Sequence, residues 1–225
     1  MKFIKPSVEL LDITQNALQK IEAAGRTCYK SEHKITDDSA EKFCEMIQSR
    51  NHMSVIEHAY ASFRIITSRD ITHELVRHRL ASYSEESTRY VNHQGKEMEF
   101  IQPYWIPDGC LKKCYDYSFG VGAEKIPEEE WDILTELEHA VIAFIFCCND
   151  AEVAYNDAIK YWGLKPQDAR CMLPGTLKSE IVMTANFREW KHFIEMRCSN
   201  AAHPDMRIIA GQIKQILHDK YPVIF

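Results

Sequence analysis

The chain has 225 residues, of which 45% are hydrophobic and 27% are charged, and this is enough to bury the core of one globular domain. Its formal net charge of −6 argues against a nucleic-acid or anionic-membrane binder, whose surface would be basic overall. Any site for an anionic ligand must therefore be local.

The cysteines and the apolar segments indicate a cellular location. The eight cysteines include no Cys-x-x-Cys pair, and the adjacent Cys147 and Cys148 fit a buried helix better than a disulfide framework. The N-terminus lacks the apolar run of a signal peptide. The most apolar stretch, 140–148, is far shorter than the roughly 20 residues that span a bilayer. We therefore expect a cytoplasmic protein with free thiols and no membrane association.

The first half of the chain begins with strand and helix patterns in alternation. Loosely alternating apolar residues over 2–13 favour an opening strand. Thr14 is placed to cap a helix that Gly25 would end. A second helix is expected to begin at Thr36, and the alternation over 59–67 predicts the next strand, with one buried face.

The middle of the chain is harder to assign. Proline and glycine interrupt the segment 95–126, so we expect an irregular excursion there apart from a short strand over 97–101. A long helix is expected from Pro127, with a break near 149–150. Its part 140–148 is apolar on every side, which is typical of deep burial or of an oligomer interface.

The remaining elements have clear start signals. Pro166 opens a short helix, and alternation over 177–184 predicts a strand. Asn186 is expected to cap the next helix, with Glu189 three residues later as in a capping box. A final helix is expected to begin at Pro204.

Arginine is concentrated in one stretch of the chain. Five of the eleven arginines lie between Arg64 and Arg89, with no lysine among them, and a helix that Ser68 can cap leads into the stretch 77–90. Guanidinium groups bind oxyanions through two parallel hydrogen bonds, whereas lysine offers a point charge. The bias favours phosphate or carboxylate recognition, with a network of Arg–Glu salt bridges as the alternative.

A second group of polar residues follows in the other half of the chain. Its members lie near helix starts or along one helix: Arg170, Asn186, Arg188, His192 and Arg197. Two such groups in an acidic protein suggest a ligand with several anionic groups, such as a dinucleotide together with a nucleotide. The Gly-rich loops of Rossmann and P-loop proteins are missing from the sequence, so the phosphates are expected to bind differently.

Other chemistries find less support. His73 and His78 are five residues apart, whereas a helical zinc site needs four, and no second pair completes Cys110 and Cys114. We therefore predict no metal. A thiolate at Cys198, beside Arg197, remains a possible nucleophile, although buried inert cysteine is the commoner state.

In this order, the motifs resemble those of the flavin-dependent thymidylate synthases. Arg77-His78-Arg79 is followed, after seven residues, by Ser87. The matching stretches run from about residue 26 to about residue 207 and include 52–58 with Ser54 and Glu57, Arg170 before Leu173-Pro174, Asn186-Phe187-Arg188, His192 and Arg197. Many members have Gln, Asn and Gly where this chain has Glu74, Ser84 and Thr88.

The resemblance implies reductive methylation of dUMP to dTMP, without a covalent enzyme nucleophile. The carbon donor would be 5,10-methylenetetrahydrofolate, the hydride carrier FAD and the reductant NADPH. It also implies a homotetramer whose subunits share active sites. We expect an α+β subunit with one domain over 1–225, in which a mainly antiparallel sheet packs with long helices.

The resemblance also implies which residues bind each ligand. Arg197 would activate the substrate by favouring ionisation at N3 of the uracil. The flavin contacts would be Ser54, Arg77, His78, Arg79, Glu85, Asn186, Phe187, Arg188 and His192. The nucleotide contacts would be Glu74, Leu75, Val76, Arg77, Glu85, Glu86, Ser87, Thr88, Arg89, Arg170 and Arg197. Two alternatives remain: a non-catalytic nucleotide- or RNA-binding protein, and a metal-dependent nucleotide hydrolase.

Overall fold

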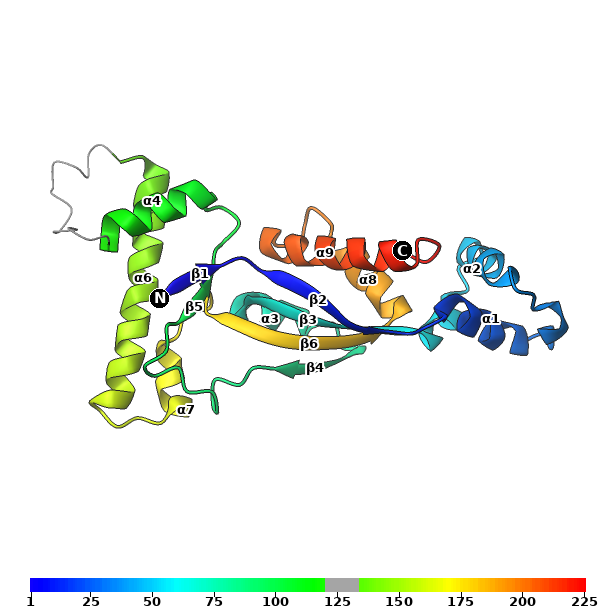
Figure 1. Ribbon diagram of the computed structural model, residues 1–225, viewed down its shortest axis with the longest axis horizontal. Helices are drawn as coiled ribbons and strands as arrows, with labels where there is room; N and C mark the ends of the chain where they lie inside the picture. Colours follow the sequence, from blue (N-terminus) through cyan, green and yellow to red (C-terminus); the bar gives the residue numbers. More distant parts are fainter. Residues whose placement is uncertain (120–133) are drawn as a thin grey trace. The chain divides into compact units, whose positions relative to one another are not determined.

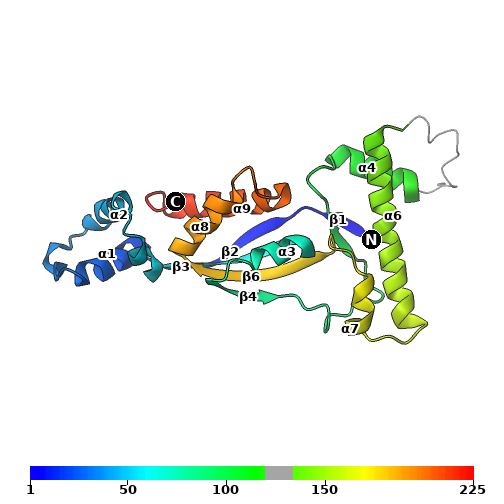
Figure 2. The ribbon, with the colours of Figure 1, turned by 180° about the vertical axis from the view of Figure 1, so that it is seen from behind.

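The computed structural model describes residues 1–119 and 134–225. The chain divides into two compact units, each built from two separate segments (Figures 1 and 2). Unit 1 comprises Met1–Lys5 and Glu86–Lys178, and unit 2 comprises Pro6–Glu85 and Ser179–Phe225. One domain over 1–225 stays a prediction.

Unit 2 is built around a four-stranded sheet in the order β2-β3-β6-β4. Its strands are β2 (Ser7–Ile13), β3 (Tyr60–Ser68), β4 (Ala81–Glu85) and β6 (Lys178–Asn186). β2 runs antiparallel to β3, and β4 runs antiparallel to β6. The mainly antiparallel sheet of the predicted α+β fold is therefore present.

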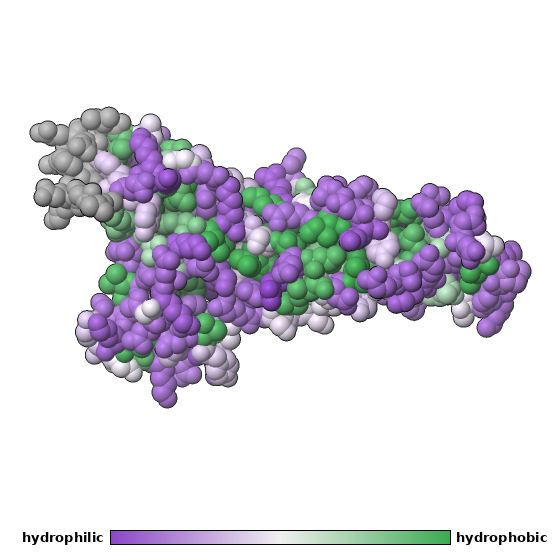
Figure 3. All heavy atoms as spheres, viewed as in Figure 1, coloured by the Kyte–Doolittle hydropathy of each residue, from purple (hydrophilic) through white to green (hydrophobic). Residues whose placement is uncertain are grey.

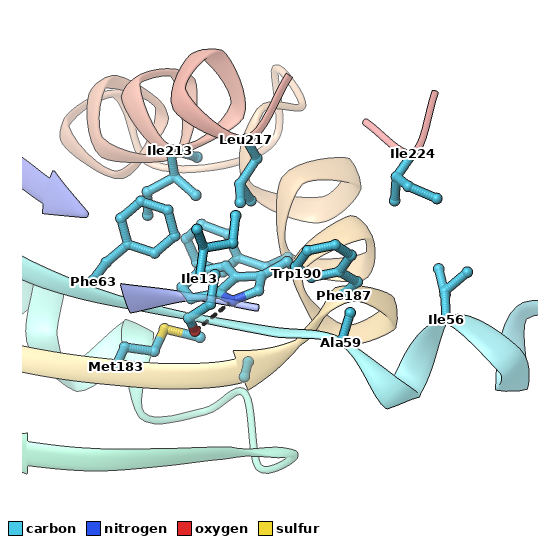
Figure 4. Packing of buried hydrophobic residues seen from close by; sticks show 14 of the residues in the cluster. Ile13, Ile56, Ala59, Phe63, Met183, Phe187, Trp190, Ile213, Leu217 and Ile224 are labelled. Carbon is cyan, nitrogen blue, oxygen red and sulfur yellow. Dashed lines mark hydrogen bonds between the residues drawn. The ribbon is translucent and has the colours of Figure 1, made fainter. Parts of the chain in front are cut away.

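The helices of unit 2 supply the other half of its core. They are α1 (Ala17–Thr27), α2 (Ser39–Ser49), α3 (Arg69–Leu75), α8 (Phe187–Arg197) and α9 (Pro204–Lys220), with 3-10 turns η1 (Glu32–Lys34) and η2 (Met53–His58). Figure 4 shows Phe63 of β3 pointing toward Ile213 of α9, with Trp190 of α8 beside them. The indole of Trp190 donates a hydrogen bond to the Ala61 carbonyl at 3.0 Å, which ties α8 to the sheet.

Unit 1 contains a small parallel pair of strands and several helices. β1 (Lys2–Ile4) pairs with β5 (Glu99–Ile101) in parallel, with Phe3 opposite Phe100. The helices are α4 (Asp108–Phe119), α6 (Glu136–Lys160) and α7 (Pro166–Ala169), followed by the 3-10 turn η3 (Arg170–Met172). One face of α6 is buried, through residues such as Ile142, Ile145 and Tyr155.

Several predicted helix starts and one predicted buried strand face are confirmed. The Ser68 hydroxyl accepts a hydrogen bond from the Ile71 amide, and the Asn186 side chain accepts one from the Glu189 amide at 2.9 Å. Ala61, Phe63 and Ile65 share the buried face of β3. The short strand in 97–101 is also present, as are the short helix at Pro166 and the final helix at Pro204.

The predicted opening strand and first helix are partly wrong. Pro6 separates β1 from β2, because proline has no amide hydrogen to donate to a strand ladder. The Thr14 hydroxyl accepts from the Tyr60 amide at 2.9 Å instead of capping α1, which begins after Asn16. Gly25 lies inside α1 and does not end it. A glycine is needed there because a Cβ atom would come within 2.6 Å of the Phe43 ring.

Three other predictions need correction. The second helix begins at Ser39, three residues later than expected, because 36–38 form a turn. The segment 95–126 contains α4 and is therefore not simply irregular.

The predicted helix start at Pro127 lies outside the described residues. α6 begins after Thr135, whose hydroxyl and Glu138 form a capping box, and it is continuous through 149–150 because its buried face packs along its length.

Among residues 1–119 and 134–225, no helix combines the length and the apolar composition needed to cross a membrane.

Candidate functional site

Five residues of unit 2 form a connected group, which we call the Arg197 cluster: Glu74, His78, Glu189, His192 and Arg197. Arg197 is the last residue of α8 and donates from Nε to His78 Nε2 at 2.9 Å. Its two terminal nitrogens donate to Glu74, one to the carboxylate at 2.9 Å and one to the backbone carbonyl at 3.2 Å. The predicted catalytic residue is thus bonded to the Arg-His-Arg motif.

A tight turn after α3 brings His78 into this cluster. The amides of Arg77 and His78 donate to the carbonyls of Glu74 and Leu75, so the chain reverses at the helix end. The Tyr83 hydroxyl lies 2.8 Å from the carbonyl oxygens of both Leu75 and His78. Burial raises the pKa of this phenol, which keeps it protonated as a donor that holds the turn.

The His78 ring is buried and held from both sides. Because Arg197 can only donate, His78 Nε2 must be the acceptor, and Nδ1 then carries the hydrogen that faces Glu189 at 3.2 Å. Burial lowers the pKa of His78 from its ordinary value of 6.5, and the positive charge of Arg197 lowers it further. The hydrogen bond to Glu189 raises this pKa, but by less than burial lowers it. The imidazole is therefore neutral at pH 7, in one tautomer.

Glu189 is a member of the cluster that the sequence analysis did not identify as functional. Its carboxylate lies 3.2 Å from Nδ1 of His78 and 3.4 Å from Nδ1 of His192. These three groups could hold a metal ion, since their ligand atoms lie within 4.8 Å of one another. The hydrogen bonds of a neutral His78 already account for the arrangement, so the absence of a metal remains our prediction.

The Arg-His-Arg motif has its two arginines at the surface. Arg77 and Arg79 are exposed, and their side chains form no hydrogen bond or ion pair with the described residues. Arg64 and Arg69, by contrast, pair with glutamates. The salt-bridge alternative therefore holds for the earlier arginines and fails for the motif itself, whose guanidinium groups are available to an anionic ligand.

Glu85 is fixed by three neighbours. Its carboxylate accepts from the hydroxyls of Thr72 at 2.7 Å and Ser179 at 2.8 Å, and it pairs with Arg69 at 3.4 Å. A carboxylate with so many protein donors has limited capacity to bind a ligand as well. Leu75 is fully buried, so a ligand would meet its backbone, while the neighbouring Val76 is exposed.

The three predicted flavin contacts at the start of α8 differ in what they leave available to a ligand. Asn186 uses its side chain as the helix cap. The Phe187 side chain is fully buried against Tyr221 and Phe225, which leaves only its backbone for a ligand. Arg188 is half exposed and pairs with Glu57 at 2.6 Å.

The remaining predicted nucleotide contacts belong to unit 1. Glu86 pairs with Lys178 at 3.0 Å, and Thr88 is buried. The Ser87 hydroxyl accepts from the Arg89 amide at 3.3 Å, while the Arg89 guanidinium stacks 5.4 Å from the Tyr90 ring centre. Arg170, at the start of η3, is exposed, and its side chain has no partner among the described residues.

Unit 2 also contains a pocket of about 1010 Å³, formed by α1, η1, α2 and η2. Ser54, a predicted flavin contact, lines it. Among the other lining residues are Lys34 and Arg50, whose side chains have no ion-pair partner in the described part of the chain. Figure 3 shows a mostly hydrophilic surface over α1 and α2. The sequence signal for this pocket was weak, because its cations are scattered over 26–52.

Sequence comparisons identify relatives of this chain. A family model described as "Thymidylate synthase complementing protein" matches residues 9–223. The flavin-dependent thymidylate synthase of Geobacter sulfurreducens is 30% identical over 225 residues, which cover 97% of this chain and 84% of the relative. That of Mycolicibacterium vanbaalenii is 34% identical over 209 residues, which cover 91% and 77%.

A solved structure has a similar fold. The crystal structure of thymidylate synthase X from Helicobacter pylori, with FAD and dUMP, matches with a TM-score of 0.72 at 21% identity. The match covers 98% of this chain and 97% of that one. From its matched residues, its relatives and its fold, this chain belongs to the thymidylate synthase complementing protein family and is an enzyme of the flavin-dependent thymidylate synthase type.

Proposed function

We propose that this enzyme reductively methylates dUMP to dTMP, with 5,10-methylenetetrahydrofolate as carbon donor and NADPH as reductant. The observation that carries the proposal is the Arg197 cluster, in which the guanidinium of α8 is bonded to the Arg-His-Arg motif after α3. A guanidinium keeps its charge at any working pH, so Arg197 can stabilise the negative charge that develops when N3 of the uracil ionises.

The residues present fit an FAD cofactor. The unpaired guanidinium groups of Arg77 and Arg79 suit a pyrophosphate, and the pocket beside Ser54 offers further cations. We assign Asn186, Phe187, Arg188 and His192 to the same ligand, with Phe187 acting through its backbone. When bound, the flavin supplies hydride transfer, while the protein orients the reactants and excludes water.

The nucleotide is assigned to both groups of arginines. Ser87 and Arg89 would donate hydrogen bonds to the phosphate, together with the exposed Arg170. Arg197 would meet the uracil. Neutral His78, held by Glu189, keeps the Arg197 guanidinium in a fixed orientation.

No covalent enzyme nucleophile is needed in this scheme. Burial raises the pKa of Cys198, the thiol next to Arg197 in sequence, and raises the pKa values of Cys44 and Cys148 to about 12. Such thiols stay protonated and react poorly with electrophiles.

We also propose a cytoplasmic homotetramer with shared active sites. Eight free cysteines favour a reducing compartment. Large apolar side chains are exposed in both units, including Leu11 and Ile208 in unit 2 and Val153 and Trp162 in unit 1. Figure 3 shows apolar atoms at the surface near β2 and α9. Exposed apolar surface of this kind is typical of subunit interfaces.

The proposal predicts the reaction of the purified protein loaded with FAD. With dUMP, methylenetetrahydrofolate and NADPH it should form dTMP, measured by chromatography. Arg197→Ala should reduce the rate by roughly a hundredfold or more, because it removes the charge that stabilises the uracil anion, and should retain the flavin absorbance. Unchanged turnover by this variant would exclude the activating role.

Two controls separate the alternatives. Release of inorganic phosphate from dUMP that a chelator abolishes would indicate a metal-dependent hydrolase instead. A colourless protein that takes up no flavin and forms no dTMP would favour a non-catalytic nucleotide-binding protein.

A further inference from the structure

The terminal nitrogens of Arg197 already have a protein partner, Glu74 of the same unit. Both terminal nitrogens donate to Glu74, one of them to its carboxylate at 2.9 Å. With the bond from Nε to His78, each of the three guanidinium nitrogens has a protein partner. Each terminal nitrogen keeps one further N–H, but an anion that binds there meets the negative charge of the carboxylate, whose oxygen lies 2.9 Å from one of these nitrogens.

The Glu74 carboxylate is not required to hold Arg197 in place. The guanidinium is already attached to His78 through Nε and to the Glu74 backbone carbonyl through a terminal nitrogen. The carboxylate also stands at the C-terminal end of α3, where the helix dipole disfavours negative charge. Its distinct contribution is thus its charge, which neutralises Arg197.

The ion pair is accessible enough to open. The Glu74 side chain is 36% exposed and that of Arg197 17%, so the carboxylate can rotate toward solvent while Arg197 keeps its two other bonds. Partly exposed ion pairs of this kind contribute little net free energy. A ligand that offers an anionic group to Arg197 can therefore displace the carboxylate.

We propose that Glu74 is a specificity-determining residue that neutralises Arg197 in the nucleotide-free enzyme and is displaced when the uracil of the nucleotide meets Arg197 and ionises at N3. The inference rests on the proposed function, in which Arg197 binds the uracil of dUMP. Glu74 then weakens dUMP binding, and it excludes nucleotides whose base cannot present a negative charge to Arg197.

The test compares dUMP affinity by calorimetry in FAD-loaded protein. Glu74→Gln keeps an acceptor for Arg197 and removes the charge, so we expect it to bind dUMP roughly two- to fivefold more tightly. Glu74→Asp keeps the charge and should bind as the unmodified protein does. The gain in Glu74→Gln should shrink as salt rises from about 0.05 M to about 0.5 M, because salt screens partly exposed charges.

A matched control separates a local effect from a change in net charge. Glu180 pairs with Arg64 at 3.1 Å and is 37% exposed, close to the exposure of Glu74, but it lies outside the Arg197 cluster. Glu180→Gln should leave dUMP affinity unchanged. If it tightens binding as much as Glu74→Gln, the effect is one of overall charge and the proposal is overturned.

The remaining outcomes distinguish this inference from the proposed function. Equal or weaker dUMP binding by Glu74→Gln, in a protein that still forms dTMP, overturns the role of Glu74 alone. Should Glu74→Gln fail to fold, Glu74→Ser serves the same comparison, because it also removes the charge. An unmodified protein that neither binds dUMP nor forms dTMP overturns the proposed function itself.

Discussion

At the residue scale, the orientation of Arg197 depends on a carboxylate that it does not touch. Glu189 is 5% exposed and faces Nδ1 of His78, which fixes the tautomer whose Nε2 accepts from Arg197. Glu189 is therefore a positioning residue. Removing it would free the imidazole to place its hydrogen on Nε2, and two donors would then face each other.

This arrangement predicts a graded response to substitution. Glu189→Gln can still accept from His78, whereas Glu189→Leu cannot, so the leucine variant should lose more kcat, by about 5- to 150-fold if one buried hydrogen bond of about 1–3 kcal/mol is lost. The KM for dUMP and the pH profile of kcat distinguish lost orientation from general damage.

The exposed Glu195 of the same helix provides the control. Glu195→Gln should retain the kcat and the KM of the unmodified enzyme. Equal kcat losses in the glutamine and leucine variants would contradict the positioning role, since only one of them lacks an acceptor.

At the scale of elements, Asn186 links the sheet to the Arg197 cluster. It is the last residue of β6, and its side chain accepts from the Glu189 amide at 2.9 Å, so the cap also fixes the helix turn that carries Glu189. Asn186→Ala should lower the free energy of unfolding by about 1 kcal/mol. Asn186→Ser, which restores a capping oxygen, should recover most of that loss in thermal denaturation. A serine variant no more stable than the alanine variant would contradict the capping role.

Local signals predicted some elements well and failed where distant contacts decide. Ser68 and Asn186 cap helices as predicted, because a cap depends on residues only three apart. Thr14 has the same chemistry but is bonded to Tyr60, and the place of Gly25 is set by Phe43 of the next helix. Neither partner can be found from local pattern.

The candidate site shows the same limit. The motif and Arg197 could be named from the sequence, but the partners of Arg197 could not, because Glu74 and Arg197 are far apart along the chain. Glu189 was predicted to complete a capping box with Asn186, but only the Asn186 half forms. The Glu189 carboxylate faces two histidines instead, which only the fold shows. The support of the turn by Tyr83 also needed the structure.

At the scale of the whole molecule, each unit is assembled from two separate segments. β1 belongs to unit 1 and pairs with β5, whereas β2, just beyond Pro6, belongs to unit 2. Alternating apolar residues predict a strand but not its partner. A single opening strand was therefore the simplest prediction from the sequence, although the chain divides at that point.

Each unit contains a buried or half-buried histidine whose protonation opposes folding. Burial lowers the pKa of His78 in unit 2 and of His93 in unit 1 below the ordinary value of 6.5. For each histidine, the unfolded chain therefore binds more protons than the folded chain at pH values between its folded-state and unfolded-state pKa. These two histidines should therefore leave the free energy of unfolding unchanged above about pH 7 and should lower it as the pH drops below about 6.5.

His93 allows this prediction to be tested outside the Arg197 cluster. Its Nε2 is buried without a hydrogen-bond partner among the described residues, and burial lowers its pKa although the charge of Glu86 raises it. His93→Gln does not titrate and should lose less stability than the unmodified protein between about pH 7.5 and about pH 5.5, measured by urea denaturation. The exposed His33 supplies the matched variant, since His33→Gln should keep the original pH dependence. If His93→Gln loses as much stability as the unmodified protein, His93 is not a source of the acid sensitivity.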